Sequence, residues 1–272
     1  MPSPVDALMT FSMGIVSGLL GGMLGLGGGV FLVPFLILGL GLKFQAAAAI
    51  SLFAVIATSS AVTAARAGRE LINLRLGMVL EVATAAGGLT GGLTAQMLSS
   101  STLQSLFSIL AFAIAIAVLR RPHDEILPQP ADPGLLGGIY RDERTGRSFT
   151  YRVQRLPFGL AASFLTGNMS SLLGVGGGII KVPVLVTWCG VPMRVAAATS
   201  ALMIGVTAVS GGVIYLGRGA LIYELAAAAI IGTQIGSAAG LRLSARTHTR
   251  KLKTMLSVVL IAVALLMLLK GS

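Results

Sequence analysis

Two glycine-rich segments have residue types that could form an anion site. Residues 25–34 read GLGGGVFLVP and residues 174–183 read GVGGGIIKVP, so glycines and proline recur 149 positions later. Successive glycines accept positive φ angles, so their backbone N–H groups can converge on one anion. The N-terminus of a following short helix adds partial positive charge. We predict anion contacts from Gly25, Gly27, Gly28 and Gly29, and from Gly174, Gly176, Gly177 and Gly178.

The alternative for these glycines is that they only permit close packing of helices. We expect that simpler role for glycines elsewhere at small-xxx-small spacing, namely Gly87 with Gly91 and Gly236 with Gly240. A nucleotide-binding phosphate loop is not expected, because the chain has no GxxxxGK[ST] motif in a strand-to-helix context. Each glycine segment ends in a proline, which we expect to bend or end the short helix after about one turn.

The composition places these segments in a membrane. The chain is 55% hydrophobic and 11% charged, with a mean hydropathy of +0.90, which leaves too little polar surface for a soluble domain. Its apolar runs are mostly about 20 residues long, the length that a helix needs to cross a bilayer core. We therefore predict an all-α integral membrane protein. We expect no secretory signal peptide, since residues 1–14 contain no Lys or Arg.

The chain is a duplicated unit. At an offset of 149, about a quarter of the positions from residue 14 to residue 119 recur without gaps. The predicted units are a first transmembrane repeat, residues 1–119, a connector, residues 120–156, and a second transmembrane repeat, residues 157–272. The recurring pairs include Gly18 and Gly167, Pro34 and Pro183, Ser51 and Ser200, Thr58 and Thr207, Gly87 and Gly236, and Gly91 and Gly240.

Each repeat contains five apolar segments, of which the second is too short to span. About 12 residues cover roughly 18 Å as a helix, against a hydrocarbon core of roughly 30 Å. The first two segments of each repeat are therefore read together as a broken helix, joined at the glycines. The segments are residues 8–24, 30–41, 46–65, 77–97 and 104–119, then 157–173, 179–190, 195–216, 222–241 and 254–269.

The basic residues decide how the broken helix lies in the membrane. The chain has 20 Lys and Arg residues. If the broken helix forms one span, they divide 12 against 7 between the two sides, with Lys181 left inside the span; if it is a hairpin that enters and leaves on one side, they divide 16 against 4. The positive-inside rule favours the hairpin, with both termini outside and the connector cytoplasmic. A hairpin plus three crossings inverts the second repeat. The two tips then meet near the midplane, an architecture typical of secondary transporters.

Several polar residues inside the predicted spans could line the same site. Ser51 and Thr58, like Ser200 and Thr207, are seven residues apart and therefore share a helix face. The alternative is that these hydroxyls bond carbonyls of the preceding turn. Asn168 lies just before the second glycine segment, and a buried amide needs partners, so we include it among the candidate binding residues.

Two cations near the second glycine segment complete the candidate site. Lys181 stands where the first repeat has Leu32, and a lysine at membrane depth needs water, a partner or a bound anion. It could attract the anion; the alternatives are snorkelling to the interface or pairing with an acidic side chain. Arg194 is the second candidate, with the alternative that it anchors the chain at the cytoplasmic interface.

Acidic residues bear on energy coupling. Glu81 lies inside a predicted span, and it could either couple transport to another ion or pair with Arg75 or Arg66 at the interface. An anion that leaves a cell with a negative interior moves downhill by about 2.3 kcal/mol per charge per 100 mV. Uniport and proton coupling therefore both stay open.

The connector is the most polar part of the chain. Residues 137–153 alternate aromatic and aliphatic side chains with charges around Thr145 and Gly146, which predicts a short β-hairpin on the cytoplasmic face. Its arginines are more typical of a topology signal than of a ligand site. The net charge of +11 favours contact with anionic lipid, and no motif supports nucleic-acid binding.

The paired GxGGG…P elements at the start of two homologous repeats, with a short charged loop between them, resemble the sulfite exporter TauE/SafE family. The resemblance covers nearly the whole chain. It implies a transporter in the bacterial inner membrane that exports small sulfur-containing anions from the cytoplasm, such as sulfite or an organosulfonate like sulfoacetate. It supports anion transport more strongly than any one anion.

The same residues argue against other function classes. A membrane-embedded enzyme would need a catalytic constellation at depth, but His123 and His248 lie in predicted loops. A metal carrier would be expected to show His, Cys or carboxylate ligands inside the spans, and the chain has one cysteine, Cys189. We therefore expect no enzyme, no cofactor and no metal. A channel or transporter for another small anion, such as a carboxylate, is the alternative. The expected partners are the anionic substrate and the bilayer, with a homodimer as an alternative to a monomer.

Overall fold

The computed structural model describes residues 2–24, 27–66, 71–120, 132–141, 148–244 and 249–271. Within these ranges the chain forms ten α-helices and a two-stranded antiparallel sheet, and the ten apolar segments predicted above all fall on helices. The helices are α1 (Pro4–Leu24), α2 (Gly29–Leu38), α3 (Phe44–Arg66), α4 (Leu74–Met97), α5 (Ser100–Arg120), α6 (Leu156–Leu173), α7 (Gly178–Thr187), α8 (Met193–Gly217), α9 (Tyr223–Ser244) and α10 (Thr249–Gly271); the strands are β1 (Gly138–Arg141) and β2 (Ser148–Tyr151).

The helices are those of a multi-pass membrane protein. Among the described residues, five are long and apolar enough to cross a bilayer: α1, α3, α4, α8 and α9. Large apolar side chains also face outward on the bundle, such as Val82, Ile109 and Leu269, each more than half exposed. Such a surface suits lipid and not water.

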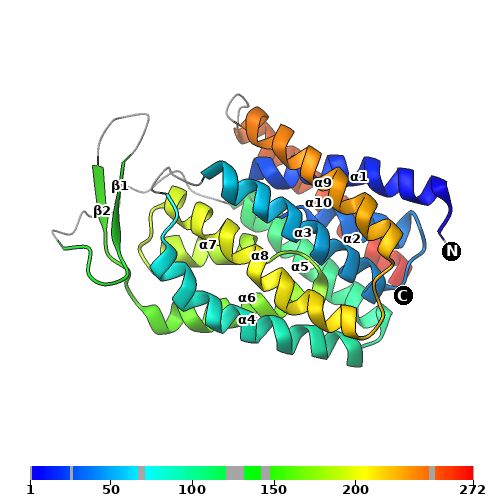
Figure 1. Cartoon of the computed structure of the whole chain (residues 1–272), viewed down its shortest axis with the longest axis horizontal. Coiled ribbons are helices and arrows are strands. Elements are labelled where there is room, and N and C mark those ends of the chain that lie inside the picture. The colour runs from blue at the N-terminus through cyan, green and yellow to red at the C-terminus, as the bar shows by residue number, and fades with distance from the viewer. Residues whose placement is uncertain are drawn as a thin grey trace.

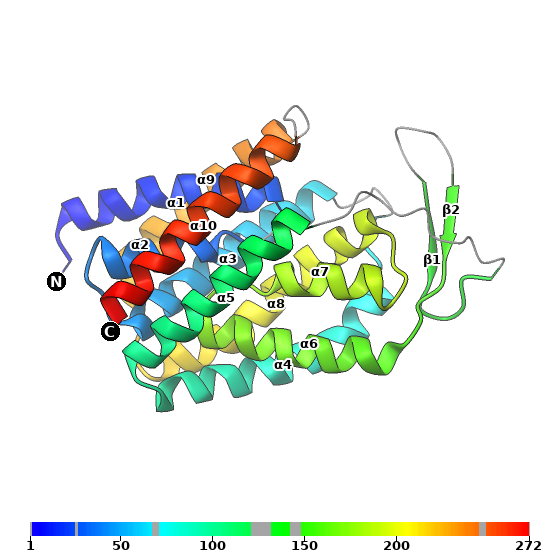
Figure 2. The same cartoon turned by 180° about the vertical axis from the view of Figure 1, so that it is seen from behind.

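The bundle has two distinct ends. The β-hairpin stands at one end, and the N- and C-termini lie near one another at the opposite end (Figures 1 and 2). Helix α2 packs against α1, and α7 packs against α6. In each pair, a long helix and the following short helix therefore lie against one another on either side of the glycines.

The packing of one repeat has a counterpart in the other. Helix α1 packs along α9, and α6 packs along α4, while α3 lies against α8 and α5 against α10. The offset of 149 residues relates α1 to α6 and α4 to α9, so the contact of α1 with α9 corresponds to the contact of α6 with α4. The same offset relates α3 to α8 and α5 to α10, so each of these two contacts joins equivalent helices. The orientation of the two repeats relative to a membrane stays a prediction.

Glycines allow close backbone approach in the two most extensive helix contacts, between α1 and α9 and between α4 and α6. A Cβ atom at Gly87 would collide with the carbonyl oxygen of Phe164, and one at Gly91 with that of Asn168. In the other repeat, a Cβ at Gly240 would collide with the carbonyl of Leu19. The predicted packing role of these small-xxx-small glycines is confirmed.

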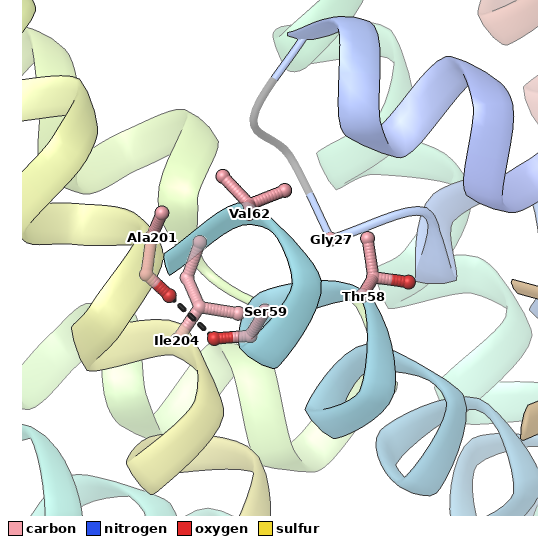
Figure 3. A pocket seen from close by; sticks show the side chains of 6 residues that line it. All are labelled: Gly27, Thr58, Ser59, Val62, Ala201 and Ile204. Atoms are coloured by element: carbon pink, nitrogen blue, oxygen red, sulfur yellow. Dashed lines mark hydrogen bonds between the residues drawn. The ribbon is translucent and has the colours of Figure 1, made fainter. Parts of the chain in front are cut away.

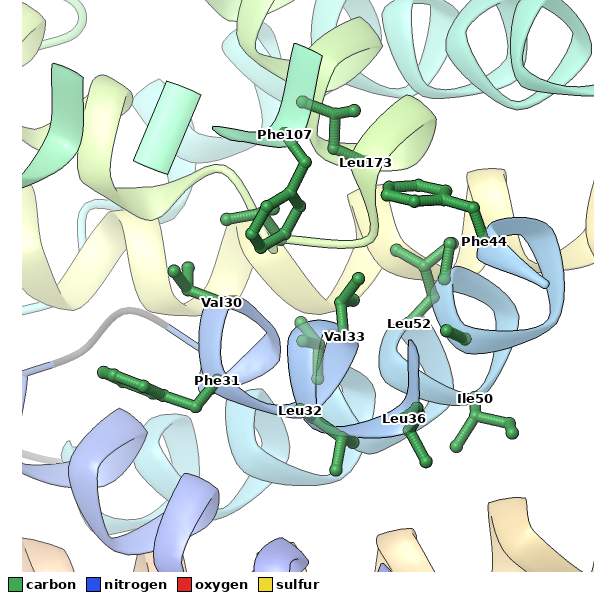
Figure 4. Packing of buried hydrophobic residues seen from close by; sticks show 14 of the residues in the cluster. Val30, Phe31, Leu32, Val33, Leu36, Phe44, Ile50, Leu52, Phe107 and Leu173 are labelled. Carbon is green, nitrogen blue, oxygen red and sulfur yellow. The ribbon is translucent and has the colours of Figure 1, made fainter. Parts of the chain in front are cut away.

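The first short helix lies in the apolar core. Val30, Leu32 and Val33 of α2 are buried together with Leu52 of α3 and Phe107 of α5 (Figure 4). This accounts for the all-apolar sequence of α2, because a helix too short to span still has to bury every face.

Of the two effects expected of the prolines, a bend or an end of the short helix, the end does not occur. Helix α2 continues four residues past Pro34, to Leu38, and α7 continues four residues past Pro183, to Thr187. Each proline removes one backbone N–H donor. The surrounding packing keeps both segments helical despite that loss.

The connector forms the predicted hairpin and docks on α4. Strands β1 and β2 pair antiparallel, with Tyr140 stacked on Phe149 at a ring distance of 5.4 Å. Asn73 caps α4 by accepting the N–H of Leu76, and its amide donates to the Tyr151 hydroxyl at 2.9 Å. Burial raises the pKa of this tyrosine. Thr145 and Gly146 of the predicted turn lie outside the described residues, as do His123 and His248.

Candidate functional site

The first glycine tip joins α1 to α2. Gly27 and Gly28 have φ angles of 82° and 75°, the left-handed region that only glycine adopts readily, and Gly29 begins α2. The carbonyl of Gly28 accepts the Ser17 hydroxyl at 2.6 Å and the N–H of Phe31 at 3.0 Å. Ser17, which sequence reasoning did not select, therefore holds the tip against α1. Gly25 lies outside the described residues.

The second tip repeats this backbone. Gly176 and Gly177 have φ angles of 86° and 58°, and Gly174 ends α6 with a φ of 71°. The predicted positive φ angles are thus present in both tips. In the second tip, however, the N–H of Gly178 donates to the carbonyl of Gly176 at 2.7 Å. One of the N–H groups expected to face an anion is therefore already bonded within the tip.

The two tips touch through α3. The Ser51 hydroxyl donates to the carbonyl of Gly174 at 2.6 Å. A Cβ atom added to Gly29 would collide with that same carbonyl and lie 2.6 Å from the Ser51 hydroxyl. Ser51 therefore connects the start of one short helix to the tip that precedes the other.

Small cavities border both tips. Gly27 and Thr58 line one of them, opposite Ala201 and Ile204 of α8, with Ser59 donating to the Ala201 carbonyl (Figure 3). Gly177 lines the other, with Thr166 and Ser170. Each has a volume of about 10 Å³, roughly what one water molecule needs. A larger anion would fit in either cavity only after the surrounding helices separate.

The four predicted hydroxyl residues are all buried but differ in their bonds. Thr58 donates to the Ala54 carbonyl of its own helix at 3.1 Å, which is the alternative weighed above. Ser51 reaches across to the second tip, as described. The Thr207 hydroxyl also lies 2.8 Å from a carbonyl of the preceding turn of its own helix, that of Met203, and in addition it takes part in an ionic cluster. The Ser200 hydroxyl has no hydrogen-bond partner within the described residues, although its side chain is fully buried.

That ionic cluster joins three helices. Lys181 Nζ lies 3.2 Å from Thr207 Oγ1 and 3.7 Å from Glu81 Oε2, and the Thr207 hydroxyl lies 2.9 Å from Glu81 Oε1. The Lys181 side chain is 2% exposed and that of Glu81 is 12% exposed. Of the alternatives for Lys181, pairing with an acidic side chain is present and snorkelling is not. The ionic partner of Glu81 is Lys181, which differs from the alternative that Glu81 pairs with Arg75 or Arg66 at the interface.

The tip places Lys181 in this cluster. Gly177 precedes α7, so Lys181 falls in the first helical turn, and its N–H donates to the Gly177 carbonyl at 3.3 Å. Thr207 projects from the middle of α8, and Glu81 from the second turn of α4. A cation, a hydroxyl and a carboxylate are thereby held next to the second tip, in an interior where unpaired charge is costly.

Two predicted residues do not join the tips. The Asn168 amide donates to the Thr90 hydroxyl at 3.1 Å, so it links α6 to α4 along their contact. Arg194 lies in the first turn of α8 and is partly buried. It is 13 residues from Thr207 on the same helix, about 20 Å away.

Two broken-helix hairpins whose glycine tips meet inside a multi-pass helical bundle are the architecture of a membrane transporter. The sulfite exporter TauE/SafE family model matches residues 10–267, and the chain belongs to this family.

The chain matches curated relatives that are named as transporters, two of them over nearly their full length. The chain is 24% identical over 266 residues to "Probable membrane transporter protein YunE" of Bacillus subtilis, covering 95% of this chain and 96% of the relative. It is 26% identical to "Probable membrane transporter protein MJ0441" of Methanocaldococcus jannaschii, covering 94% and 93%. A "Probable membrane transporter protein" of Xylella fastidiosa is 34% identical over 42% of this chain and 44% of the relative. No solved structure matches the chain significantly.

Proposed function

We propose that this transporter exports small sulfur-containing anions, sulfite or short organosulfonates such as sulfoacetate, across the bacterial inner membrane. The observation that carries the proposal is the buried ammonium of Lys181 beside a glycine tip, in a chain of the TauE/SafE family. A sulfur oxyanion is small and negatively charged, and it accepts several hydrogen bonds. A cation, hydroxyls and backbone N–H groups would bind such an anion together.

In this proposal the anion binds between the two tips, next to Lys181. The N–H groups of the tip glycines other than Gly178, whose N–H is bonded to the Gly176 carbonyl, add donors, and the N-termini of α2 and α7 add partial positive charge. Because the cavities at the tips are close to the size of one water molecule, the structure would represent a closed state. Separation of the two repeats on either side would then expose the site alternately.

The direction of transport depends on topology, for which the ends of the bundle provide an argument. Helices α4, α6 and α8 begin toward the β-hairpin end (Figure 1), and Arg75, Arg155 and Arg194 lie at or next to these helix starts. Helix α3 begins and α8 ends toward the termini, next to Lys43 and Arg218. We infer that the β-hairpin faces the cytoplasm and both termini face outside. A cysteine at Ser148 on a cysteine-free background should then resist impermeant maleimide in intact cells and react in inverted vesicles. Labelling in intact cells would reverse the orientation.

The substrate class is tested by ligand-dependent stability. A ligand that binds only the folded protein raises its melting temperature, so purified protein is screened with sulfite, sulfate, thiosulfate, sulfoacetate, taurine, lactate and phosphate. We expect a sulfur oxyanion or a short sulfonate to give the largest increase. If lactate stabilises the protein and none of the sulfur anions does, the carboxylate alternative replaces this proposal.

A further inference from the structure

The buried ion pair of Lys181 and Glu81 has a long contact distance and incomplete hydrogen bonding. Lys181 has three N–H donors, yet the hydrogen bond that it makes among the described residues is to Thr207. Its contact with Glu81 Oε2 is 3.7 Å, too long for a hydrogen bond, and this oxygen has no hydrogen-bond partner within the described residues. A structural ion pair is favourable at depth only with good geometry and full hydrogen bonding. This pair lacks both.

The charges near Glu81 make Lys181 its dominant electrostatic partner. Helix α4 packs against α6, which has no ionisable side chain, and against α8, which carries Arg194 and Tyr215. Arg194 is distant from the cluster, and the Tyr215 hydroxyl is bonded to the carbonyls of Ser171 and Leu172. On α4 itself, Arg75 lies six residues before Glu81, about 9 Å along the axis. If another anion pairs with Lys181, Glu81 therefore loses the positive charge that stabilises its ionised form.

We propose that Glu81 neutralises Lys181 in the empty transporter, and that it binds a proton when a substrate anion takes its place. The inference rests on the proposed function and deepens it, because it makes Glu81 the residue that couples anion transport to protons. Before binding, the cluster holds Lys181 as a cation and Glu81 as an anion. After binding, it holds the Lys181 cation, the bound anion and the neutral carboxylic acid of Glu81. The net charge of the cluster therefore changes by the charge of the anion plus the one positive charge of the proton.

The proton uptake follows from the cost of leaving a carboxylate without its cation. Transfer of an unpaired ionised carboxylate into a low-dielectric interior is so unfavourable that such a group is neutralised instead. The bound anion adds repulsion in the same direction. The proton comes from water at the β-hairpin end, toward which α4 begins (Figure 1); Glu81 lies in the second turn of this helix and its side chain is 12% exposed. The anion and the proton would then cross together.

This coupling changes the driving force. A monovalent anion that crosses with one proton carries no net charge, so its flux would depend on the pH difference and not on the membrane potential. A divalent anion such as sulfoacetate would still carry one negative charge outward, and the potential would still favour its export.

The test measures proton uptake when an anion binds to the purified full-length protein. The probes are sulfoacetate and thiosulfate, because both stay fully ionised between about pH 6 and 8. In a weakly buffered solution, the absorbance change of a pH-indicator dye then reports the protons that the protein takes up. We expect close to one proton for each anion bound. We also expect the wild-type dissociation constant to increase by up to about tenfold per pH unit across this range.

The variant Glu81→Gln should separate the two events. Its neutral amide resembles the protonated acid, so anion binding should persist or strengthen while proton uptake disappears and the dissociation constant becomes independent of pH. Glu224→Gln is the matched control, because Glu224 is an exposed carboxylate in the first turn of α9; its proton uptake should equal that of the wild type.

The outcomes distinguish the two proposals. Anion binding by wild-type protein without proton uptake would overturn the role of Glu81 and leave the substrate class intact, whatever the folding of the variants. Undiminished proton uptake in Glu81→Gln would have the same meaning. If neither sulfur anion binds, the proposed function fails and this inference fails with it.

Discussion

The two glycine tips share a backbone but not a chemistry. In both, two glycines with positive φ precede a ten-residue helix that contains one proline. The second tip adds a buried lysine, which is bonded to a threonine of α8 and paired with a glutamate of α4. At an offset of 149 residues, the positions of Lys181, Thr207 and Glu81 correspond to Leu32, Thr58 and Ile230.

The first tip shows that the same backbone can form without charged residues. Leu32 is completely buried in the apolar core, and the Thr58 hydroxyl is bonded within its own helix. Since this tip keeps the same backbone with an apolar set, Lys181 and Glu81 are not required to build the hairpin. A pair of charges that the fold does not need, placed where charge is expensive, points to function.

Removal of the lysine should have the largest effect. Lys181→Met is expected to reduce sulfoacetate transport in liposomes by roughly 30- to 1000-fold, because loss of one buried charge partner costs about 2–4 kcal/mol. Lys181→Arg should retain much of the activity, since charge is what is used. Leu32→Met, the matched change in the first tip, should leave transport nearly unchanged. A Lys181→Met protein that transports at the wild-type rate would remove the distinction between the tips.

Stability separates a binding defect from a folding defect in this variant. Lys181→Met leaves Glu81 without its cation and should lower the melting temperature. The double variant Lys181→Met/Glu81→Gln removes both charges and should recover stability without recovering transport. Recovery of transport in the double variant would mean that Lys181 serves only to balance Glu81.

A side chain in the second tip should have an intermediate effect. Gly177 and Gly219 have φ angles of 58° and 65°, so alanine costs about 1–2 kcal/mol of backbone strain at either position. A Cβ at Gly177 meets Thr166 and Ser170 at 3.0–3.4 Å, whereas one at Gly219 meets nothing within 4 Å. We expect Gly177→Ala to reduce transport about tenfold more than Gly219→Ala at a similar melting temperature.

Equal transport by these two variants would count against a binding role for the tip. The corresponding substitution in the first tip is less informative. A Cβ at Gly28 would lie 2.7 Å from the Ser17 carbonyl, so Gly28→Val would disturb the packing of α1 as well as any bound anion.

The smallest difference is expected between the two equivalent threonines. Thr207→Val removes the hydroxyl between Lys181 and Glu81 and should weaken anion affinity by roughly 1 kcal/mol, about fivefold. Both hydroxyls contact a carbonyl of their own helix, but that of Thr207 also contacts Lys181 and Glu81, so Thr58→Val should leave affinity unchanged. Isothermal titration with the anion that stabilises the protein most would measure both. Equal losses would indicate that the two tips contribute alike.

The sequence predicted the parts of this site that depend on local patterns. Hydropathy and length located all ten helices, and consecutive glycines predicted the positive φ angles at Gly27, Gly28, Gly176 and Gly177. These features follow from short-range constraints, so they can be recognised without knowledge of the tertiary contacts.

Contacts between distant segments were harder to predict. The pair of Glu81 and Lys181 joins helices that are 100 residues apart in the chain. A signal was present, because opposite charges inside spans are rare and tend to find one another. Asn168 gave no such signal: its proximity to the second tip in sequence did not reveal that its amide faces Thr90.

The location of the bound anion tests the central claim most directly. Selenite resembles sulfite, and its selenium can be located by anomalous diffraction in crystals of the wild-type protein. The account predicts a selenium peak in contact with Lys181 Nζ and the second glycine tip, with the Glu81 carboxylate displaced from the lysine. A peak at Arg194 or against the first tip alone, with the pair of Lys181 and Glu81 intact, would contradict it.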